Sequence, residues 1–331
     1  MSAPANQNFF YNHFPTPEYL TLSTSGVAIT DEYVHFIQFR HGLVGSGLRL
    51  AHHEKIALPA GVVESGFINN AEGLTAVLAD LARRYGLNYV RATLPEERAY
   101  LFTATIDKVP AEGLRDAVAF IIEENVPVTL ADSIFDFDIL SAGDEADKLH
   151  VSVAVLSNKV VNFYLPVFEA AGITPVSFDI ESQAIARAVV SKGDKSAQLI
   201  LNLGEKKCGF YVVEDEVVQF TTTLKFGAGD RAHLNDLKTE IKKIFTFWAA
   251  HDKSASADHN IKKVLVCGEA SLDQSFVTEL MAESPVLYEF ANPWINFSGA
   301  TDKLPSELAK DTLEYAPAIG LAMPHPHRTY V

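Results

Sequence analysis

The stretch GVAITDEYVHFIQFRHGLVGSGLRL at residues 26–50 decides the fold, because the stretch ILNLGEKKCGFYVVEDEVVQFTTTL at residues 200–224 repeats its pattern. Each stretch has apolar runs broken by turn residues, which predicts a meander of three antiparallel strands. The two overlay without a gap, with Gly26 on Ile200 and Leu50 on Leu224. A duplicated meander predicts two related domains whose turns face one ligand from both sides.

Composition limits the classes of protein that this chain can belong to. With 331 residues, 48% of them hydrophobic and 21% charged, it has room for two or more globular cores. Its 27 basic and 42 acidic residues give a net charge of -15, which disfavours nucleic acid and anionic lipid as direct partners. Cys208 and Cys267 each lie in an apolar run and are interpreted as buried reduced thiols, as expected of a cytoplasmic protein.

Neither secretion nor membrane insertion is predicted. Residues 1–20 lack the basic and apolar regions of a signal peptide, and no run of about 18 apolar residues occurs in the chain. We expect residues 1–20 to form a loose tail, and His325 and His327 to belong to a frayed end rather than to a metal site.

Periodicity predicts an α/β chain with an insertion. Asn70 and Gly86 are typical of the start and the end of a helix, and a buried strand is expected at Tyr89 to Leu94. Residues 96–170 then follow the order strand, helix, two strands, helix, which predicts a small α+β module. Further expected elements are a strand at 176–180, helices at 181–190 and 234–248, a strand at 264–267, a helix after Gly268 and a last helix in YAPAIGLAM. Within the module, Asp132, Asp136 and Asp138 alternate with apolar residues, which favours a half-exposed strand over a cation site.

Seven segments, in this order, resemble motifs of the actin-like ATPase superfamily, and within it those of the PilM family of type IV pilus assembly proteins, relatives of the cell-division protein FtsA. They are GVAITDEYV (26–34), FDIESQAIARA (178–188), LILNLGEKKCGF (199–210), KFGAG (225–229), EIKKIFTFW (240–248), VLVCGEA (264–270) and YAPAIGLA (315–322). Each motif is weak alone, and the ordered set is more specific.

The resemblance implies an α/β fold: a duplicated actin-like (ribonuclease H-like) fold with an inserted SHS2-like subdomain and a truncated subdomain IIB. The implied parts are subdomain IA at 21–95 and 171–192, the inserted subdomain IC at 96–170, and subdomain IIA at 197–331 with a minimal IIB at about 230–260.

The resemblance also implies a vestigial nucleotide cleft, with no catalytic residue and no metal ligand. Its implied members are Thr30, Asp31, Asp179, Gly204, Glu205, Gly227, Gly229, Gly268 and Glu269. Ala28 and Asn202 stand where the superfamily carries the carboxylates on the magnesium side. Asp31, Glu205 and Glu269 would repel a polyphosphate by roughly 3 kcal/mol for each pair of like charges about 5 Å apart, and Lys206 and Lys207 would offset part of this. We therefore predict no cofactor.

The expected function is that of a non-catalytic cytoplasmic scaffold of a type IV pilus, peripheral to the inner membrane. The resemblance implies that it binds the cytoplasmic N-terminal segment of a PilN-like membrane protein between the first subdomain and the inserted module, with self-association as a further option. One alternative is an active ATPase that binds ATP and Mg through unusual ligands such as Asp31 or Asp179. A remoter alternative is a relative of sugar or acetate kinases.

Overall fold

The computed structural model describes residues 25–41, 48–142, 147–228, 231–251, 260–297 and 312–323. The predicted tail at 1–20, the turn GLVGSG at 42–47, Gly229, and the histidines at 325 and 327 lie outside these ranges. Among the described residues, no helix is both long enough and apolar enough to cross a membrane.

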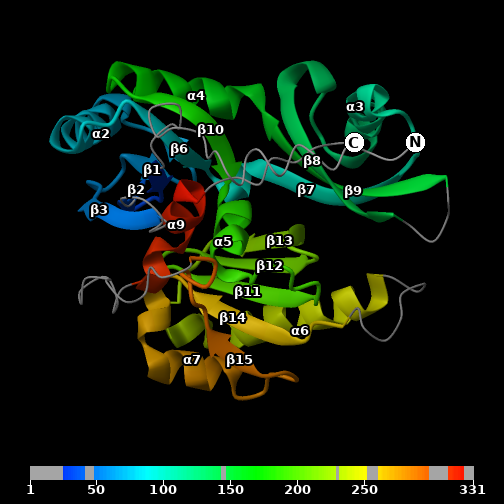
Figure 1. Cartoon of the computed structure of the whole chain (residues 1–331). Coiled ribbons are helices and arrows are strands. Elements are labelled where there is room, and N and C mark those ends of the chain that lie inside the picture. Colours follow the sequence, from blue (N-terminus) through cyan, green and yellow to red (C-terminus); the bar gives the residue numbers. More distant parts are fainter. Residues whose placement is uncertain are drawn as a thin grey trace.

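Two five-stranded sheets with the same strand order form the body of the molecule (Figure 1). Read from the outer meander strand, the first sheet has the order β3-β2-β1-β6-β10, and the second has the order β13-β12-β11-β14-β15. In each sheet the three meander strands pair antiparallel and the other two strands pair parallel. The strands of the first sheet are β1 (Ser25–Ile29), β2 (Tyr33–His41), β3 (Leu48–Ala57), β6 (Tyr89–Leu94) and β10 (Thr174–Ile180). Those of the second are β11 (Gln198–Leu203), β12 (Cys208–Glu214), β13 (Val217–Leu224), β14 (Lys263–Cys267) and β15 (Tyr288–Phe290).

The repeat seen in the sequence holds for two strands of each meander and fails in the third. Ala28 pairs with His35 in the first copy, and Asn202 pairs with Gly209 at the matching positions of the second. In the third strand, His41 pairs with Leu48, whereas Thr222, which the ungapped overlay places on Leu48, pairs with Phe210. The overlay without a gap is therefore wrong beyond the second strand, because β12 and β13 are joined by a two-residue turn and β2 and β3 by a longer connection.

Helices cover the sheets close to where the sequence predicts them. They are α2 (Ala71–Tyr85), α4 (Asn158–Ala170), α5 (Glu181–Val189), α6 (Leu234–His251), α7 (Gln274–Met281) and α9 (Ala316–Ala322), with the short 3-10 turns η2 (Glu96–Arg98), η6 (Glu269–Leu272) and η8 (Thr312–Tyr315). The Asn70 side chain accepts a hydrogen bond from the Gly73 N–H, and Gly86 ends α2 at a φ of 65°. Both ends of α2 thus follow from capping chemistry.

The inserted module has its own sheet and its own core. Its sheet has the order β7-β9-β8, formed by β7 (Ala99–Asp107), β9 (Lys148–Ser157) and β8 (Ser133–Ala142), and α3 (Leu114–Asn125) covers one face. Helix α4 falls within the segment expected to be inserted, yet its buried residues Tyr164 and Phe168 pack with Leu74 and Leu78 of α2 in the core of the first sheet. Packing therefore groups α4 with the body and leaves β7 to β9 as the separate unit.

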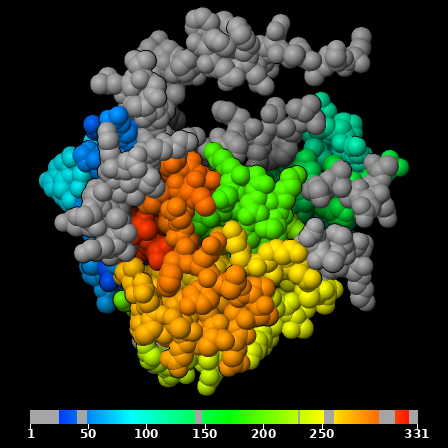
Figure 2. Space-filling model, turned by 60° about the horizontal axis from the view of Figure 1, so that its bottom comes forward, coloured from blue at the N-terminus to red at the C-terminus, as the bar shows by residue number. Residues whose placement is uncertain are grey.

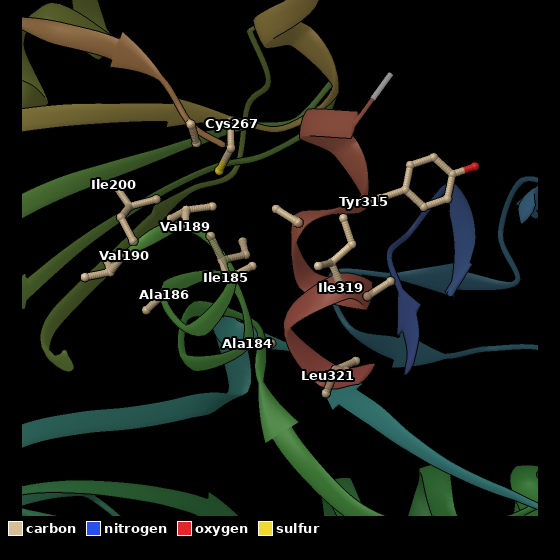
Figure 3. Packing of buried hydrophobic residues seen from close by; sticks show 14 of the residues in the cluster. Ala184, Ile185, Ala186, Val189, Val190, Ile200, Cys267, Tyr315, Ile319 and Leu321 are labelled. Atoms are coloured by element: carbon tan, nitrogen blue, oxygen red, sulfur yellow. The ribbon is translucent and has the colours of Figure 1, made fainter. Parts of the chain in front are cut away.

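Helices α5 and α9 pack against each other between the two sheets (Figure 3). Their contact is close because a Cβ atom at Gly320 would lie 1.8 Å from the Ala184 carbonyl oxygen. Helix α9 also lies on β1, where a Cβ atom at Gly26 would be 2.1 Å from the Ala318 carbonyl oxygen. The last described helix thereby completes the core of the first sheet. In the view of Figure 2, the part of the chain coloured yellow to orange, which contains α6, β14, α7 and β15, forms the lower part of the molecule.

Candidate functional site: a bridged cleft and an open groove

A narrow cleft lies where the turns after β1 and β11 face each other, as the duplication predicts. Its volume is only about 50 Å³. Of the predicted site residues, the cleft brings together Thr30, Asp31, Gly204, Glu205, Gly268 and Glu269. Six carboxylates line it, from Asp31, Glu32, Glu181, Glu205, Glu269 and Glu314, together with Lys206 and Lys207. The lining is therefore strongly acidic.

The polar side chains of the turn after β1 form hydrogen bonds with backbone groups of the protein. The Thr30 hydroxyl accepts hydrogen bonds from the N–H groups of Glu32 and Tyr33 at 3.3 and 3.0 Å. The Asp31 carboxylate accepts from the N–H groups of Ser65 and Gly66 at 2.7 and 3.2 Å. Asp31 thus fastens the small hairpin of β4 (Val63–Glu64) and β5 (Phe67–Ile68) to the end of β1.

Three of the predicted site glycines, which follow β11, β13 and β14, lie against other atoms of the protein. A Cβ atom at Gly204 would lie 2.7 Å from the Lys207 carbonyl oxygen, and one at Gly227 would lie 1.5 Å from that of Glu205. Gly268, at a φ of 92°, would place a Cβ atom 2.6 Å from the Asn202 side-chain oxygen. The space on the Cβ side of these glycines is occupied by the chain itself, so packing within the protein is enough to require a glycine at each of these positions.

Lys207 supplies a positive charge within the cleft. Its ammonium lies 3.1 Å from Glu181 and 3.3 Å from Glu97, both on elements that follow strands of the first sheet. Burial alone would lower the pKa of Lys207, but the charges of Glu181 and Glu97 outweigh it and raise that pKa. Asn202 donates a hydrogen bond to Glu181 at 3.2 Å. Lys207 therefore remains a cation and links the second turn to the first half of the chain.

Lys55 makes a second bridge from the opposite side. It forms ion pairs with Glu269 and with Glu314, the latter at 2.7 Å, and its ammonium lies 3.9 Å from the centre of the Tyr33 ring. Burial would lower the pKa of Lys55, but the hydrogen bonds to Glu269 and Glu314 outweigh it and raise that pKa. At the rim, Lys206 lies 3.2 Å from Glu32. Three lysines thus cross the cleft to carboxylates of the other side.

The residues present do not fit ATP and Mg in the manner of the superfamily. Ala28 is 1% exposed and packs in the core, and Asn202 is committed to Glu181. A cleft of about 50 Å³ is far smaller than the roughly 300 Å³ at the lower end for ligand pockets. Among the described residues, one set of three carboxylates, Glu32, Glu205 and Glu269, has oxygens within 4.8 Å of one another and could hold a cation. Two of the three already pair with Lys206 and Lys55.

Among the described residues, two of the predicted site residues, Asp179 and Gly227, are not part of the cleft lining. Asp179 does not line it, and instead forms a 2.7 Å ion pair with Arg187 in a different depression. Placing Asp179 with the nucleotide residues is therefore not supported by the geometry, because its strand, β10, is the edge strand of the first sheet. Gly229 lies outside the described residues.

The depression that contains Asp179 is a groove of about 930 Å³. Its walls are β8 and β9 of the module, β10 and α5 of the body, and the turn between β12 and β13. Among its apolar lining residues are Ile134, Leu156, Phe178, Val190 and Val217. Strand β8 is the edge of the module sheet. The groove is thus large enough for an extended peptide and lies beside β8, an edge strand of the module sheet among the described residues.

Sequence reasoning missed the residues that bridge the cleft. Lys55 lies in a meander strand, and Glu97, Glu181 and Glu314 come from three separate elements. The two lysines after Gly204 were noted as possible compensation for a ligand site, and the structure pairs them with protein carboxylates instead. No local sequence motif indicates such partners, because only the tertiary fold brings them together.

The fold is that of the actin-like ATPase proteins, as the sequence motifs predict. The solved "PilM-PilN type IV pilus biogenesis complex" contains a chain that matches with a TM-score of 0.77 and 19% identity, covering 92% of this chain and 98% of that chain. The ethanolamine utilization protein EutJ from Carboxydothermus hydrogenoformans matches with a TM-score of 0.50 and 12% identity, covering 93% and 90%.

A family model described as "Type IV pilus assembly protein PilM" matches residues 26–234. The chain belongs to this family of type IV pilus assembly proteins, which confirms the resemblance seen in its motifs. A comparison with curated proteins gave no match.

Proposed function

We propose that the chain is a non-catalytic cytoplasmic scaffold of the inner-membrane assembly platform of a type IV pilus. It binds the cytoplasmic N-terminal segment of a PilN-like membrane protein in the groove between the inserted module and the body, and reaches the membrane through that partner. The module acts as an SHS2-like recognition unit. The solved relative is a PilM-PilN complex, which supports a partner of this kind.

The observation that carries the proposal is the groove of about 930 Å³ beside the edge strand β8. Ile134, on that strand, is 45% exposed and lines the groove. An extended peptide can pair with a strand edge through its backbone and place alternate side chains on such apolar residues. The groove adjoins β10 and α5, which lie in the part of the first subdomain at residues 171–192, so the docking surface that we propose lies between that subdomain and the module, as the resemblance implies.

The state of the cleft supports a non-catalytic role. Six carboxylates against two lysines in the lining oppose a polyphosphate, and the three lysine bridges occupy the space between the two halves. The two halves are therefore held together across the cleft by ion pairs between side chains of the protein itself. Partner binding is then independent of nucleotide.

A binding titration tests the proposal. The probe is a synthetic peptide of the cytoplasmic N-terminal segment of the PilN-like protein encoded in the same genome. It is titrated into the full chain with and without ATP at about 1 mM, the upper end of typical KM values. Ile134→Gln should weaken binding by about tenfold, because an apolar contact in the groove is lost. The matched control is Phe120→Gln, since Phe120 is 78% exposed on α3, over the other face of the module sheet. Absence of binding, or equal binding by both variants, would contradict the groove as the site.

One observation favours a second candidate, an active ATPase with unusual metal ligands. The carboxylates of Glu32, Glu205 and Glu269 are close enough to share a divalent cation. In that case Mg-dependent ATP hydrolysis would be measurable and Glu205→Gln would abolish it, because the cation would lose one of its three carboxylate ligands. A preparation with no hydrolysis above that of the Glu205→Gln variant excludes this function.

A further inference from the structure

Carboxylates line the groove from three separate elements, one of which is β10 with Asp179. Asp136 and Asp138 lie on β8 of the module, and Asp215 and Glu216 form the turn between β12 and β13. Both turn residues have positive φ, 51° for Asp215 and 64° for Glu216, as in a tight two-residue hairpin turn. The backbone therefore fixes where this acidic turn projects.

The pleat of β8 directs Asp136 to the groove side of the module sheet. Phe135 and Phe137 are buried in the module core with α3, so Ile134, Asp136 and Asp138 point to the opposite face. On that face Asp136 stands opposite Ala154 of β9, and Ile134 stands opposite Leu156. Asp136 is exposed, and within the described part of the chain its one hydrogen bond comes from the N–H of Phe137, at 3.0 Å.

The cations of the groove do not neutralise it. Five carboxylates line it, from Asp136, Asp138, Asp179, Asp215 and Glu216, against two cations in the lining, Arg187 and Lys192. Beside the lining, Lys195 lies 3.8 Å from Asp215, and Glu216 accepts a hydrogen bond from the Gly193 N–H at 2.6 Å, so the carboxylates still outnumber the cations by five to three. Arg187 is engaged by Asp179 at 2.7 Å and donates to the Gly320 carbonyl oxygen at 3.0 Å. The groove thus combines apolar walls with an excess of negative charge, in a chain whose net charge is already -15.

On the basis of the proposed function, we infer that the groove selects a partner segment in which a Lys or Arg lies between apolar residues. The basic side chain meets Asp136 of the module and the acidic turn Asp215–Glu216 of the second half, while the apolar residues lie along Ile134 and Leu156. Cytoplasmic segments that flank membrane spans are rich in Lys and Arg, which matches this charge. An acidic or phosphorylated segment is repelled.

The test uses the full chain and two probes: the N-terminal peptide of the PilN-like protein, and the same peptide with each Lys and Arg replaced by Gln. The wild-type chain should bind the basic peptide about tenfold more tightly than the neutral one. Raising the NaCl concentration from about 50 to 500 mM should remove most of that difference, because exposed charges are screened. Asp136→Asn should weaken binding of the basic peptide by about three- to tenfold and leave the neutral peptide unaffected.

The matched control is Glu124→Gln, which removes one charge from an exposed position on α3, away from the groove lining. It should change neither peptide's affinity. If the basic and neutral peptides bind equally, or if the natural segment contains no Lys or Arg, charge selection is overturned while the proposed function stands. If neither peptide binds the wild-type chain, both are overturned.

Discussion

The buried carboxyl group of Glu96 makes the stability of the fold depend on pH. It accepts hydrogen bonds from the N–H and the hydroxyl of Ser182, at 2.9 and 3.0 Å, at the start of α5. Burial is the largest cause that raises the pKa of Glu96, from 4.5 to about 7. The folded state therefore binds more protons than the unfolded state between these values. The contribution is fully present below about pH 4.5 and is lost as the pH rises through about 7, at a cost of up to about 3 kcal/mol.

Glu96→Gln should remove this dependence. We expect the variant to show a flatter free energy of unfolding between about pH 5 and 8, and to be at least as stable as the wild type at about pH 8. Chemical denaturation at several pH values measures this, with the exposed Glu124→Gln as a control that should keep the wild-type slope. A variant with an unchanged slope would show that Glu96 is not the group that titrates.

Lys207 is the residue whose loss should damage the cleft most clearly. Lys207→Met leaves Glu97 and Glu181, whose side chains are 10% and 9% exposed, without their shared cation. We expect a loss of about 3 kcal/mol in the free energy of unfolding, because breaking one partner of a buried pair strands the other charge. Adding Glu181→Gln should restore part of the loss.

Lys206→Met is the matched control for that experiment. Lys206 is 60% exposed and pairs with Glu32 at the rim. A surface pair of this kind contributes about 0–1 kcal/mol. Equal losses for the two lysine variants, measured by urea denaturation, would contradict the view that Lys207 bridges the halves from a desolvated position.

At the scale of elements, the contact between α5 and α9 depends on a missing side chain. A methyl group at Gly320 would lie 1.8 Å from the Ala184 carbonyl oxygen, and the backbone of α5 cannot yield without shifting the helix. Gly320→Ala should therefore destabilise the chain by about 2 kcal/mol or more, in spite of the better helix propensity of alanine. Gly113→Ala is the control, since its methyl group would meet its nearest neighbour at 3.7 Å. A Gly320→Ala variant as stable as the control would show that the helices separate easily.

Elements with strong local signals could be predicted from the sequence. Strand β6 has the predicted bounds Tyr89 and Leu94, and α2 lies between Asn70 and Gly86 as predicted, because an Asn cap and a Gly in the left-handed conformation act within a few residues. The third meander strand was misplaced because connection length, which an ungapped overlay ignores, sets its register. The grouping of α4 with the first core was not visible either, since helix packing partners are fixed by the tertiary fold.

For the molecule as a whole, we predict that ATP has little effect. With binding no tighter than about millimolar, 1 mM ATP would stabilise the fold by at most about 0.4 kcal/mol. For a chain of 331 residues this shifts the melting temperature by less than about 1 °C. Restoring the two carboxylates through Ala28→Asp and Asn202→Asp should not create hydrolysis, because Ala28 lies in the core at 1% exposure. Calorimetry that finds micromolar affinity for ATP would contradict this prediction.

The position of the cleft could be predicted from the sequence, but the partners of the side chains that line it could not. The duplicated turns identified Thr30, Gly204 and their neighbours as facing residues, and the structure brings them together. The sequence predicted that Asp31 and Glu269 would face a ligand, whereas the structure gives them protein partners, the Ser65 and Gly66 N–H groups and Lys55. Such partners come from strands and turns distant in sequence, and residue type alone does not reveal them.

The position of α9 on β1 has a consequence for how the chain is made. Gly26 lies against Ala318, and Arg91 donates hydrogen bonds to the carbonyl oxygens of Leu321 and Met323. During synthesis, the first sheet leaves the ribosome long before the helix that covers one of its faces has been translated. Contacts between residues so distant along the chain slow folding. The newly synthesised N-terminal half therefore exposes an apolar face, to which chaperones can bind, until residues 316–322 have been translated.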